Sequence, residues 1–313
     1  MTSEPILRVV EISKRFGDLQ AVDRLSFHVQ PGEIYGLLGP NGAGKTTSIS
    51  MTCGLLKPDA GQVFVEALEF WRQPARAQRK IGVVPQDIAL YEELSGRENL
   101  VFWGRLAGVS ESEVATKADK MLERLTLSGR SGDLVKTYSG GMKRRINIGC
   151  ALMHDPKLVL LDEPTVGIDP QARASILKFV KSLTDGGTAV LYTTHYLEEA
   201  EELCDRIGII DHGKILAEGK LADLQRSLGS DQLFILEGNF VDCDPAALPE
   251  LSEQFKQIQI TDHQWIVSDT RDHHPSESFK TLLDLPIPID NVTLKKPNLN
   301  DVFLQLTGRE LRE

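Results

Sequence analysis

The chain has 313 residues, of which 41% are hydrophobic and 26% are charged, and its formal net charge is −10. The length favours two domains over one, and the acidic balance argues against nucleic acid as the main partner. No stretch of the sequence approaches the ~18 consecutive apolar residues that a membrane-spanning helix needs.

The N-terminal part of the chain is predicted to start with short strands. Residues 7–12 and 25–29 have the alternating pattern of strands, and the second run ends at the turn formed by residues 31–32. An apolar strand over residues 34–38 then leads into a glycine-rich loop. A helix is predicted from about residue 45 to residue 54.

The next part of the chain is predicted to become helical after two more strands. These strands cover residues 63–65 and 81–84. From about residue 95 to residue 127 the apolar residues recur at helical spacing, and Ser95 and Glu98 have the spacing of a capping box.

Helices and strands alternate from residue 139 onward. We predict a helix to about residue 153, a buried strand over residues 157–161 and a helix over residues 172–183. A strand over residues 188–193 and a hairpin over residues 207–216 follow. This alternation is typical of an α/β fold with a mainly parallel sheet, to which the N-terminal strands add an antiparallel part.

The character of the sequence changes near the C-terminal end. Short strand-like runs at residues 233–236 and 265–267 alternate there with polar loops and prolines. We therefore predict two domains, residues 1–227 and residues 228–313, the second being a small α+β appendage. A helical subdomain is expected within the first domain, at about residues 87–153.

A phosphate-binding loop is the first motif that indicates chemistry. It consists of Gly39, Pro40, Asn41, Gly42, Ala43, Gly44, Lys45, Thr46 and Thr47. The run fits G-x-x-x-x-G-K-[ST] in full, and a strand precedes it and a helix follows it, which argues against a glycine-rich turn with a stray lysine. Lys45 is expected to bridge the β- and γ-phosphates of a nucleotide, and the Thr46 hydroxyl to bind Mg²⁺.

Two acidic residues follow a buried strand. Asp162 ends the apolar run 158–161, so its carboxylate is expected beside the phosphate loop, where it would hold Mg²⁺ through water. Glu163 points in another direction and is the candidate to polarise an attacking water. The alternative is that one of them caps the following helix, and this alternative weighs more for Glu163.

Two further polar residues, Gln86 and His195, each follow a predicted strand. Parallel strands end at the same edge of a sheet, so both side chains are expected to converge near the γ-phosphate. Gln86 is also a candidate metal ligand. Either residue taken alone would be an ordinary loop residue, but together with the other motifs both are candidate catalytic residues.

A second phosphate cradle is formed by Ser139, Gly140 and Gly141. A Ser-Gly-Gly turn that opens a helix offers a hydroxyl and consecutive backbone N–H donors to a phosphate. Two cradles for one nucleotide make sense if two copies of the chain share it. The chain is therefore interpreted as half of a motor.

The order of these motifs resembles that of the ATP-binding subunits of ABC transporters. The resemblance covers about residues 5–225. It implies a P-loop NTPase core with an antiparallel β subdomain and an inserted helical subdomain, with ATP and Mg²⁺ bound and ATP hydrolysed. It also implies a head-to-tail homodimer, in which each ATP lies between the phosphate loop of one copy and the Ser-Gly-Gly turn of the other.

The resemblance assigns roles to further residues. Ser139, Gly140 and Gly141 would bind the γ-phosphate of the nucleotide held by the other copy. Asp169, in the run Gly167-Ile168-Asp169, would communicate across the interface. Phe16 would stack on adenine, although an aromatic residue after a strand is also explained by plain packing.

The chain departs from the family's commonest signature, L-S-G-G-Q. Tyr138 replaces the leucine, Met142 replaces the glutamine, and Gly149-Cys150 stands where many relatives have Ala-Arg. The serine and both glycines remain, so phosphate binding and ATP hydrolysis are still expected.

Two features resemble the drug- and antibiotic-export branch of the family, whose best-known members confer daunorubicin-type resistance. One is the run Tyr138–Met142, and the other is the closing run Asn298–Glu310, predicted as a helix with Asn300 as its cap. That branch carries its membrane-spanning permease on a separate chain. The resemblance therefore places this chain at the cytoplasmic face of the cell membrane, bound through that subunit.

Contact with a membrane partner is expected after Gln86. Residues 87–94 with Phe102 and Trp103 are predicted to form a groove for a short cytoplasmic helix of the partner. The alternative is that these residues pack the helical subdomain, which is the favoured interpretation for Trp103. Tyr91 and Leu94 are expected to be exposed.

The sequence thus predicts an ATPase that powers a separate transporter subunit, most simply an exporter of drugs, antibiotics or other hydrophobic cargo. One alternative is a soluble ABC ATPase that acts on ribosomes or DNA, but the chain has neither tandem ATPase units nor a long coiled-coil insertion. Another is a module that uses ATP only to dimerise, which the presence of Glu163 and His195 argues against.

Overall fold

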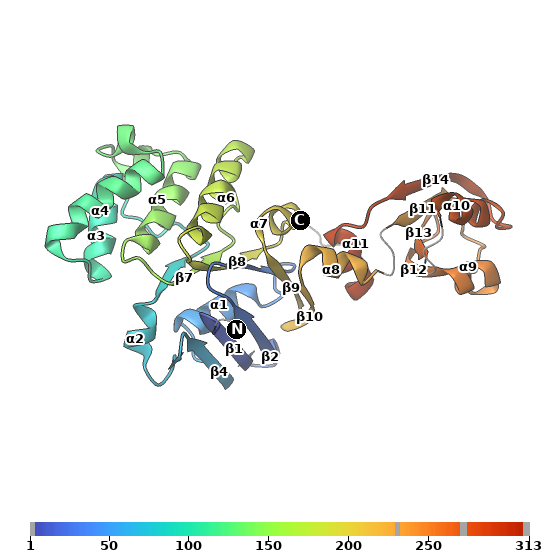
Figure 1. The fold of residues 1–313 in the computed structure, drawn as a ribbon, viewed down its shortest axis with the longest axis horizontal. Helices are drawn as coiled ribbons and strands as arrows, with labels where there is room; N and C mark the ends of the chain where they lie inside the picture. The colour runs from blue at the N-terminus through green and yellow to red at the C-terminus, as the bar shows by residue number, and fades with distance from the viewer. Residues whose placement is uncertain (1–3, 229–231, 270–273, 309–313) are drawn as a thin grey trace. The chain divides into compact units, whose positions relative to one another are not determined.

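The computed structural model describes residues 4–228, 232–269 and 274–308 (Figure 1). The chain divides into two compact units, Met1–Leu216 and Ala217–Glu313, and the division falls within strand β10. Within the described ranges, no helix combines the length and the apolar character needed to cross a membrane.

The first unit is an α/β structure. Its strands are β1 (Leu7–Phe16), β2 (Leu19–Val29), β3 (Ile34–Leu38), β4 (Ala60–Val65), β5 (Leu68–Glu69), β6 (Ile81–Val84), β7 (Leu158–Asp162), β8 (Ala189–Thr194), β9 (Arg206–Asp211) and β10 (Lys214–Gly219). Its helices are α1 (Lys45–Cys53), α2 (Pro74–Gln78), α3 (Gly96–Leu106), α4 (Glu111–Arg124), α5 (Gly140–Leu152), α6 (Pro170–Thr184) and α7 (Leu197–Leu203), with short 3₁₀ turns at Ser128–Arg130 and Val135–Thr137.

The central sheet has the strand order β10-β9-β3-β8-β7-β6, and its β9-β3-β8-β7-β6 portion is parallel. These five strands therefore end at one edge. The register pairs Leu38 with Thr194 and Asp162 with Thr193, so the segments that follow β3, β7 and β8 leave the sheet side by side. The predicted α/β class with a mainly parallel sheet is confirmed.

A separate antiparallel sheet, of order β2-β1-β4-β5, forms the N-terminal part of the unit. Its inward side chains share one buried apolar cluster with α1 and with residues of β3, β7 and β8. Both β1 and β2 are longer than the sequence pattern indicated, because they continue as a hairpin beyond the buried residues.

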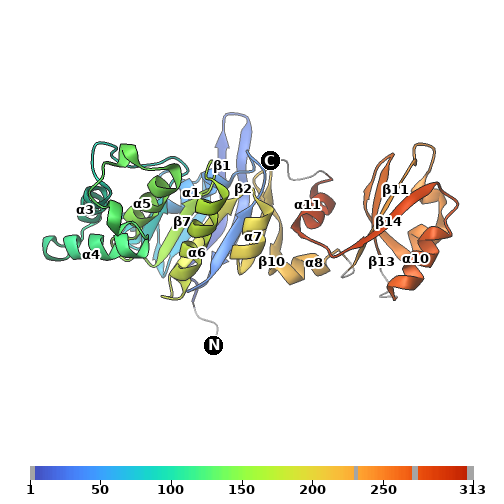
Figure 2. The same cartoon turned by 90° about the horizontal axis from the view of Figure 1, so that it is seen from above.

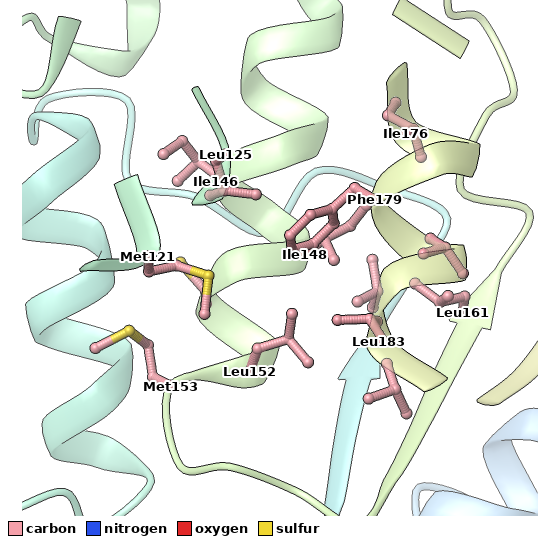
Figure 3. Packing of buried hydrophobic residues seen from close by; sticks show 14 of the residues in the cluster. Met121, Leu125, Ile146, Ile148, Leu152, Met153, Leu161, Ile176, Phe179 and Leu183 are labelled. Carbon is pink, nitrogen blue, oxygen red and sulfur yellow. The ribbon is translucent and has the colours of Figure 1, made fainter. Parts of the chain in front are cut away.

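The inserted helical part is formed by α3, α4 and α5, which Figures 1 and 2 show grouped at one end of the unit. Helix α3 begins at the predicted capping box of Ser95 and Glu98. A second apolar cluster joins these helices to α6 and to the sheet (Figure 3). Gly149 permits this close packing, because a Cβ atom there would lie 2.7 Å from Leu125 Cδ1.

The second unit contains an antiparallel sheet of order β12-β13-β11-β14. Its elements are α8 (Leu221–Arg226), β11 (Leu233–Gly238), α9 (Pro249–Gln254), β12 (Phe255–Ile260), β13 (Gln264–Asp269), α10 (Pro275–Leu283), β14 (Ile289–Lys295) and α11 (Leu299–Thr307), with a 3₁₀ turn at Pro245–Ala247. The fully buried Trp265 lies in its apolar core. The sequence placed the domain change after residue 227, whereas α8 here belongs to the second unit, where Gln225 Nε2 donates to the Pro297 carbonyl at 2.9 Å.

The predicted cap of the final helix is wrong by two residues. Asn298, not Asn300, is the N-cap of α11. Its side chain accepts from the Asp301 backbone N–H at 3.1 Å, and Asp301 accepts from the Asn298 backbone N–H at 3.0 Å. This reciprocal pair satisfies two N–H groups at the helix start, and Asn300 has no equivalent partner at N3. The last residues of the predicted run, Arg309 and Glu310, lie outside the described residues.

Candidate nucleotide-binding and hydrolysis site

The phosphate loop connects β3 to α1 and has the geometry of an anion cradle. Gly44 has φ +104°, and a Cβ atom there would lie 2.5 Å from the Ala21 carbonyl oxygen, so only glycine fits. Helix α1 begins at Lys45 without a side-chain cap and without an acidic residue in its first turn. The N–H groups and the positive dipole end of this helix are therefore available to a phosphate.

Lys45 is buried and all three of its ammonium hydrogens have acceptors. Nζ donates to the carbonyl oxygens of Gly39 at 2.7 Å and Pro40 at 2.9 Å, and it pairs with Glu163 Oε1 at 2.9 Å. An ammonium group has three donors, so this set is complete. A phosphate that binds Lys45 has to replace one of these acceptors, and Glu163 is the one that lies outside the loop, directly after β7.

Glu163 lies between Lys45 and His195. Its Oε1 contacts Lys45, and its Oε2 lies 2.9 Å from His195 Nδ1. The residue has φ +44°, and its backbone N–H donates to Thr193 Oγ1 at 3.0 Å, which holds this strained conformation. The structure therefore brings together Lys45, Glu163 and His195, which the sequence singled out separately. Glu163 does not cap a helix.

His195 is tied to the phosphate loop through the backbone. It follows Thr194, whose carbonyl oxygen accepts from the Gly39 N–H at 3.2 Å. The end of β8 and the start of the loop are therefore held together, and the imidazole stays beside Glu163.

Asp162 is buried next to Glu163. Its Oδ1 accepts from Thr193 Oγ1 at 2.7 Å. Burial raises the pKa of this carboxyl and the negative charge of Glu163 adds to the rise, whereas hydrogen bonds from Thr193 and Thr46 and the charge of Lys45 oppose it. A carboxylate and a hydroxyl are the oxygen donors that Mg²⁺ prefers when nucleotide phosphates complete its coordination.

Among the described residues, no three His, Cys, Asp or Glu side chains gather as a metal site of their own. The oxygen donors of Asp162 and Thr46 nevertheless fit Mg²⁺, because this ion is commonly bound by one or two carboxylates together with substrate phosphates. Gln86, the third predicted ligand, is exposed in the segment that follows β6.

The segment around Gln86 is held by helix α5, which the sequence did not suggest. Arg144 is almost completely buried and donates from Nη1 to the Pro85 carbonyl at 2.9 Å and from Nη2 to the Gln86 carbonyl at 2.5 Å. One turn later, Asn147 Oδ1 accepts from the Ala89 N–H at 3.2 Å. The sequence carries one signal for these contacts: Arg144 and Asn147 are polar residues three positions apart on an otherwise apolar helix face.

Replacing Arg144 with methionine is expected to lower the free energy of unfolding by about 2–3 kcal/mol, because two partly buried carbonyl groups lose their charged donor. ATP turnover is expected to fall as well, since Gln86 is no longer held. Urea unfolding and phosphate release measure the two effects. Lys143→Met is the matched control, because Lys143 pairs with Glu92 near the surface; equal losses in both variants would contradict the role of Arg144.

The Ser-Gly-Gly turn lies at the start of α5. Ser139 is the N-cap, and its Oγ accepts from the Met142 N–H at 3.3 Å. Ser139 and Gly140 are exposed, whereas Gly141 is buried against α6. The Ser139 hydroxyl and the start of the helix at Gly140 are therefore accessible to solvent, as a phosphate site needs.

The departures from the common signature are explained by packing. Met142 is partly buried and contacts the apolar cluster of the helical part. Tyr138 is buried, and its hydroxyl donates to the Arg130 carbonyl at 2.5 Å. Both side chains face the helical part of the unit, so neither replaces the donors of Ser139.

The last two predicted site residues are exposed. Asp169 is the N-cap of α6 and accepts from the Ala172 N–H at 2.9 Å. Phe16 ends β1 with 49% of its side chain exposed, and Lys14 Nζ lies 5.9 Å from its ring centre. Plain packing therefore does not account for Phe16, and adenine stacking stays a prediction.

Comparisons with known proteins identify the family of the chain. The family described as "ABC transporter" matches residues 22–166. The linearmycin resistance ATP-binding protein LnrL of Bacillus subtilis is 43% identical, with 98% of this chain and all of that protein covered. The daunorubicin resistance ATP-binding protein DrrA3 of Streptomyces coeruleorubidus is 39% identical, with 96% of this chain and 95% of that protein covered.

Solved structures resemble the first unit. An ATP-binding subunit of an ABC transporter matches with a TM-score of 0.65 and 32% identity, over 72% of this chain and 93% of that one. A dimeric ATP-binding cassette in a post-hydrolysis state with ADP and phosphate matches with a TM-score of 0.62 and 25% identity, over 68% and 98%. The chain therefore belongs to the ATP-binding subunits of ABC transporters, in their drug-resistance branch, and it binds and hydrolyses ATP.

Proposed function

We propose that this chain hydrolyses Mg·ATP to power a separate membrane-spanning subunit that exports drugs, antibiotics or other hydrophobic compounds. The names of its relatives support export, since they include drug-resistance proteins and a Nod factor export ATP-binding protein of Sinorhizobium fredii that is 37% identical. The observation that carries the mechanism is the buried contact of Lys45, Glu163 and His195.

In the proposed reaction Lys45 changes partners. Phosphates that enter the cradle attract Lys45 away from Glu163, and the released carboxylate then orients and polarises the attacking water. His195 Nδ1 holds the carboxylate in place, which leaves the other ring nitrogen to face the γ-phosphate. The resting contact thus keeps the base neutralised until nucleotide is present.

We assign Mg²⁺ to Thr46, Asp162 and Gln86. When bound, this ion neutralises charge on the transferred phosphoryl group. Thr46 and Asp162 support the assignment because their oxygen atoms lie together beside Lys45. Gln86 is supported by the two hydrogen bonds through which Arg144 holds its segment.

We further propose a head-to-tail homodimer. Ser139 and Gly140 are exposed at the start of α5, and they would bind the γ-phosphate in the cradle of the other copy, with Gly141 beside them. Asp169 is also exposed and would contact the partner copy. The dimeric relative with bound ADP and phosphate supports this assembly.

A large open cavity in the first unit supports docking of the membrane subunit. Its volume is about 1220 Å³, and its walls come from α2, β6, α3, α4 and α5. Ala89, Trp103 and Leu106 line it, so it overlaps the predicted groove only in part. Tyr91 is exposed as predicted, but Leu94 is half-buried, because its carbonyl accepts from the Val135 N–H and draws it inward.

Replacing Leu106 with glutamate tests this docking site. Leu106 is 68% exposed, so the fold and the basal ATPase rate are expected to stay unchanged, whereas co-purification with the membrane subunit is lost. The measurement is affinity purification from detergent-extracted membranes. Leu283→Glu, at a residue 62% exposed in the second unit, is the control. Retained co-purification of the Leu106 variant would contradict the assigned groove.

Binding to a membrane subunit would place the chain at the cytoplasmic face of the membrane. Recovery of a polytopic membrane protein with the tagged chain, and stimulation of its ATPase activity by that protein, is the result that tests the proposed function. Neither the family match nor the named relatives point to the alternative of an ATPase that acts on ribosomes or DNA.

A further inference from the structure

A buried carboxylate near the proposed catalytic residues Glu163 and His195 takes part in none of the steps above. Glu199 belongs to α7 and is only 2% exposed. It accepts three hydroxyl hydrogen bonds, from Thr165 Oγ1 at 2.5 Å, Tyr192 OH at 2.9 Å and Thr194 Oγ1 at 2.8 Å. The Arg173 Nε atom lies 3.6 Å from Glu199 Oε1.

These donors adjoin the residues of the site. Thr194 directly precedes His195, and its Oγ1 also accepts from the Tyr196 backbone N–H at 2.9 Å. Thr194 thus links the backbone on both sides of His195 to Glu199. Thr165 follows Glu163 by two residues and lies on the segment that leads to Asp169.

Arg173, the cation beside Glu199, also contacts the segment that contains His195. The Arg173 guanidinium carbon lies 4.4 Å from the centre of the Tyr196 ring, and that ring lies 4.2 Å from the His195 ring. A buried ionised carboxylate is costly unless donors satisfy it, and a satisfied buried network is rigid. The end of β8, the segment that follows Glu163 and helix α6 are therefore all fixed to one side chain.

We propose that Glu199 is a positioning residue that holds His195 against Glu163 and ties both to the segment of Asp169. The inference rests on the proposed roles of Glu163 and His195. The polar contacts of Glu199 within the described part of the chain are with three hydroxyl groups and Arg173, so it acts through Thr194 and Thr165.

Glu199→Gln is the decisive variant because it keeps the size of the side chain. An amide has one acceptor oxygen in place of two, so at least one hydroxyl loses its acceptor. We expect kcat to fall about 10–100-fold, since small misplacement of a catalytic group is costly, with the KM for ATP unchanged within about threefold. Glu198→Gln is the matched control, because Glu198 precedes it on the same helix and is exposed.

A second readout separates positioning from mere stability. The ¹⁵N and ¹H signals of the His195 imidazole, assigned by comparison with His195→Ala, are expected to shift in Glu199→Gln and to stay in place in Glu198→Gln. The milder variants Thr194→Val and Thr165→Val serve if Glu199→Gln does not fold, and Thr194→Val is expected to shift the same signals.

The inference is overturned if kcat of Glu199→Gln matches that of Glu198→Gln, or if the His195 signals stay in place while stability alone falls. The proposed function is tested separately: a Glu163→Gln variant that still turns over ATP would reject it. Loss of turnover in Glu163→Gln with normal turnover in Glu199→Gln would therefore reject only the positioning role.

Discussion

Glu163→Gln is expected to stop ATP turnover almost completely while ATP still binds. The amide keeps the size of the carboxylate and can still contact His195, but it can neither pair with Lys45 as an anion nor accept a proton. General bases contribute about 10²–10⁴-fold to rates, and kcat is expected to fall by an amount in this range. Phosphate release measures kcat, and nucleotide binding by fluorescence or calorimetry measures the affinity.

The same variant is expected to reveal the shared nucleotide. With Mg·ATP, Glu163→Gln should form a stable dimer, observed by light scattering, because hydrolysis no longer reopens the interface. Adding Ser139→Ala to this variant should remove the dimer, since the hydroxyl that faces the other copy's γ-phosphate is lost. Full turnover by Glu163→Gln would reject the proposed base.

The oligomeric state tests a separate part of the proposal. If Glu163→Gln stays monomeric at saturating ATP, the measurement is repeated with the membrane subunit present. A monomer in both experiments would reject the γ-phosphate role of Ser139, whereas a dimer that forms only with the membrane subunit would show that this partner closes the site.

Lys45→Ala is expected to weaken ATP binding about 10–100-fold, because hydrogen bonds from a charged group contribute about 1.5–3 kcal/mol. The nucleotide-free protein should also lose stability, by roughly 3 kcal/mol, since Glu163 stays buried without its cation. Nucleotide titration measures the first effect, and urea unfolding measures the second.

A double variant separates these two effects. Lys45→Ala combined with Glu163→Gln removes both charges, so its free energy of unfolding should exceed that of Lys45→Ala alone. Its ATP affinity should stay low, because the amide does not replace the ammonium. If the double variant is no more stable than Lys45→Ala, the contact of Lys45 with Glu163 does not stabilise the nucleotide-free protein.

Local sequence patterns predicted much of the fold because their causes are local. The capping pair Ser95–Glu98 and the alternation of apolar strands with amphipathic helices depend on residues close in the chain. The predicted helices and strands form where expected, although β1 and β2 extend further and the structure adds elements that the sequence analysis did not predict. The cap of α11 was misplaced because Asn298 and Asn300 have the same chemistry. Only Asn298 has an acidic residue, Asp301, at N3, and the choice between them follows from where the helix starts.

The family was readable from the sequence, because its motifs need particular residue types in a fixed order, as in residues 39–47 and 139–141. Only the tertiary structure decided how Lys45, Glu163 and His195 meet, and that Arg144 and Glu199 hold the segments around them. These contacts join residues from separate elements. Packing brings such residues together, so their exact contacts do not follow from their spacing along the chain.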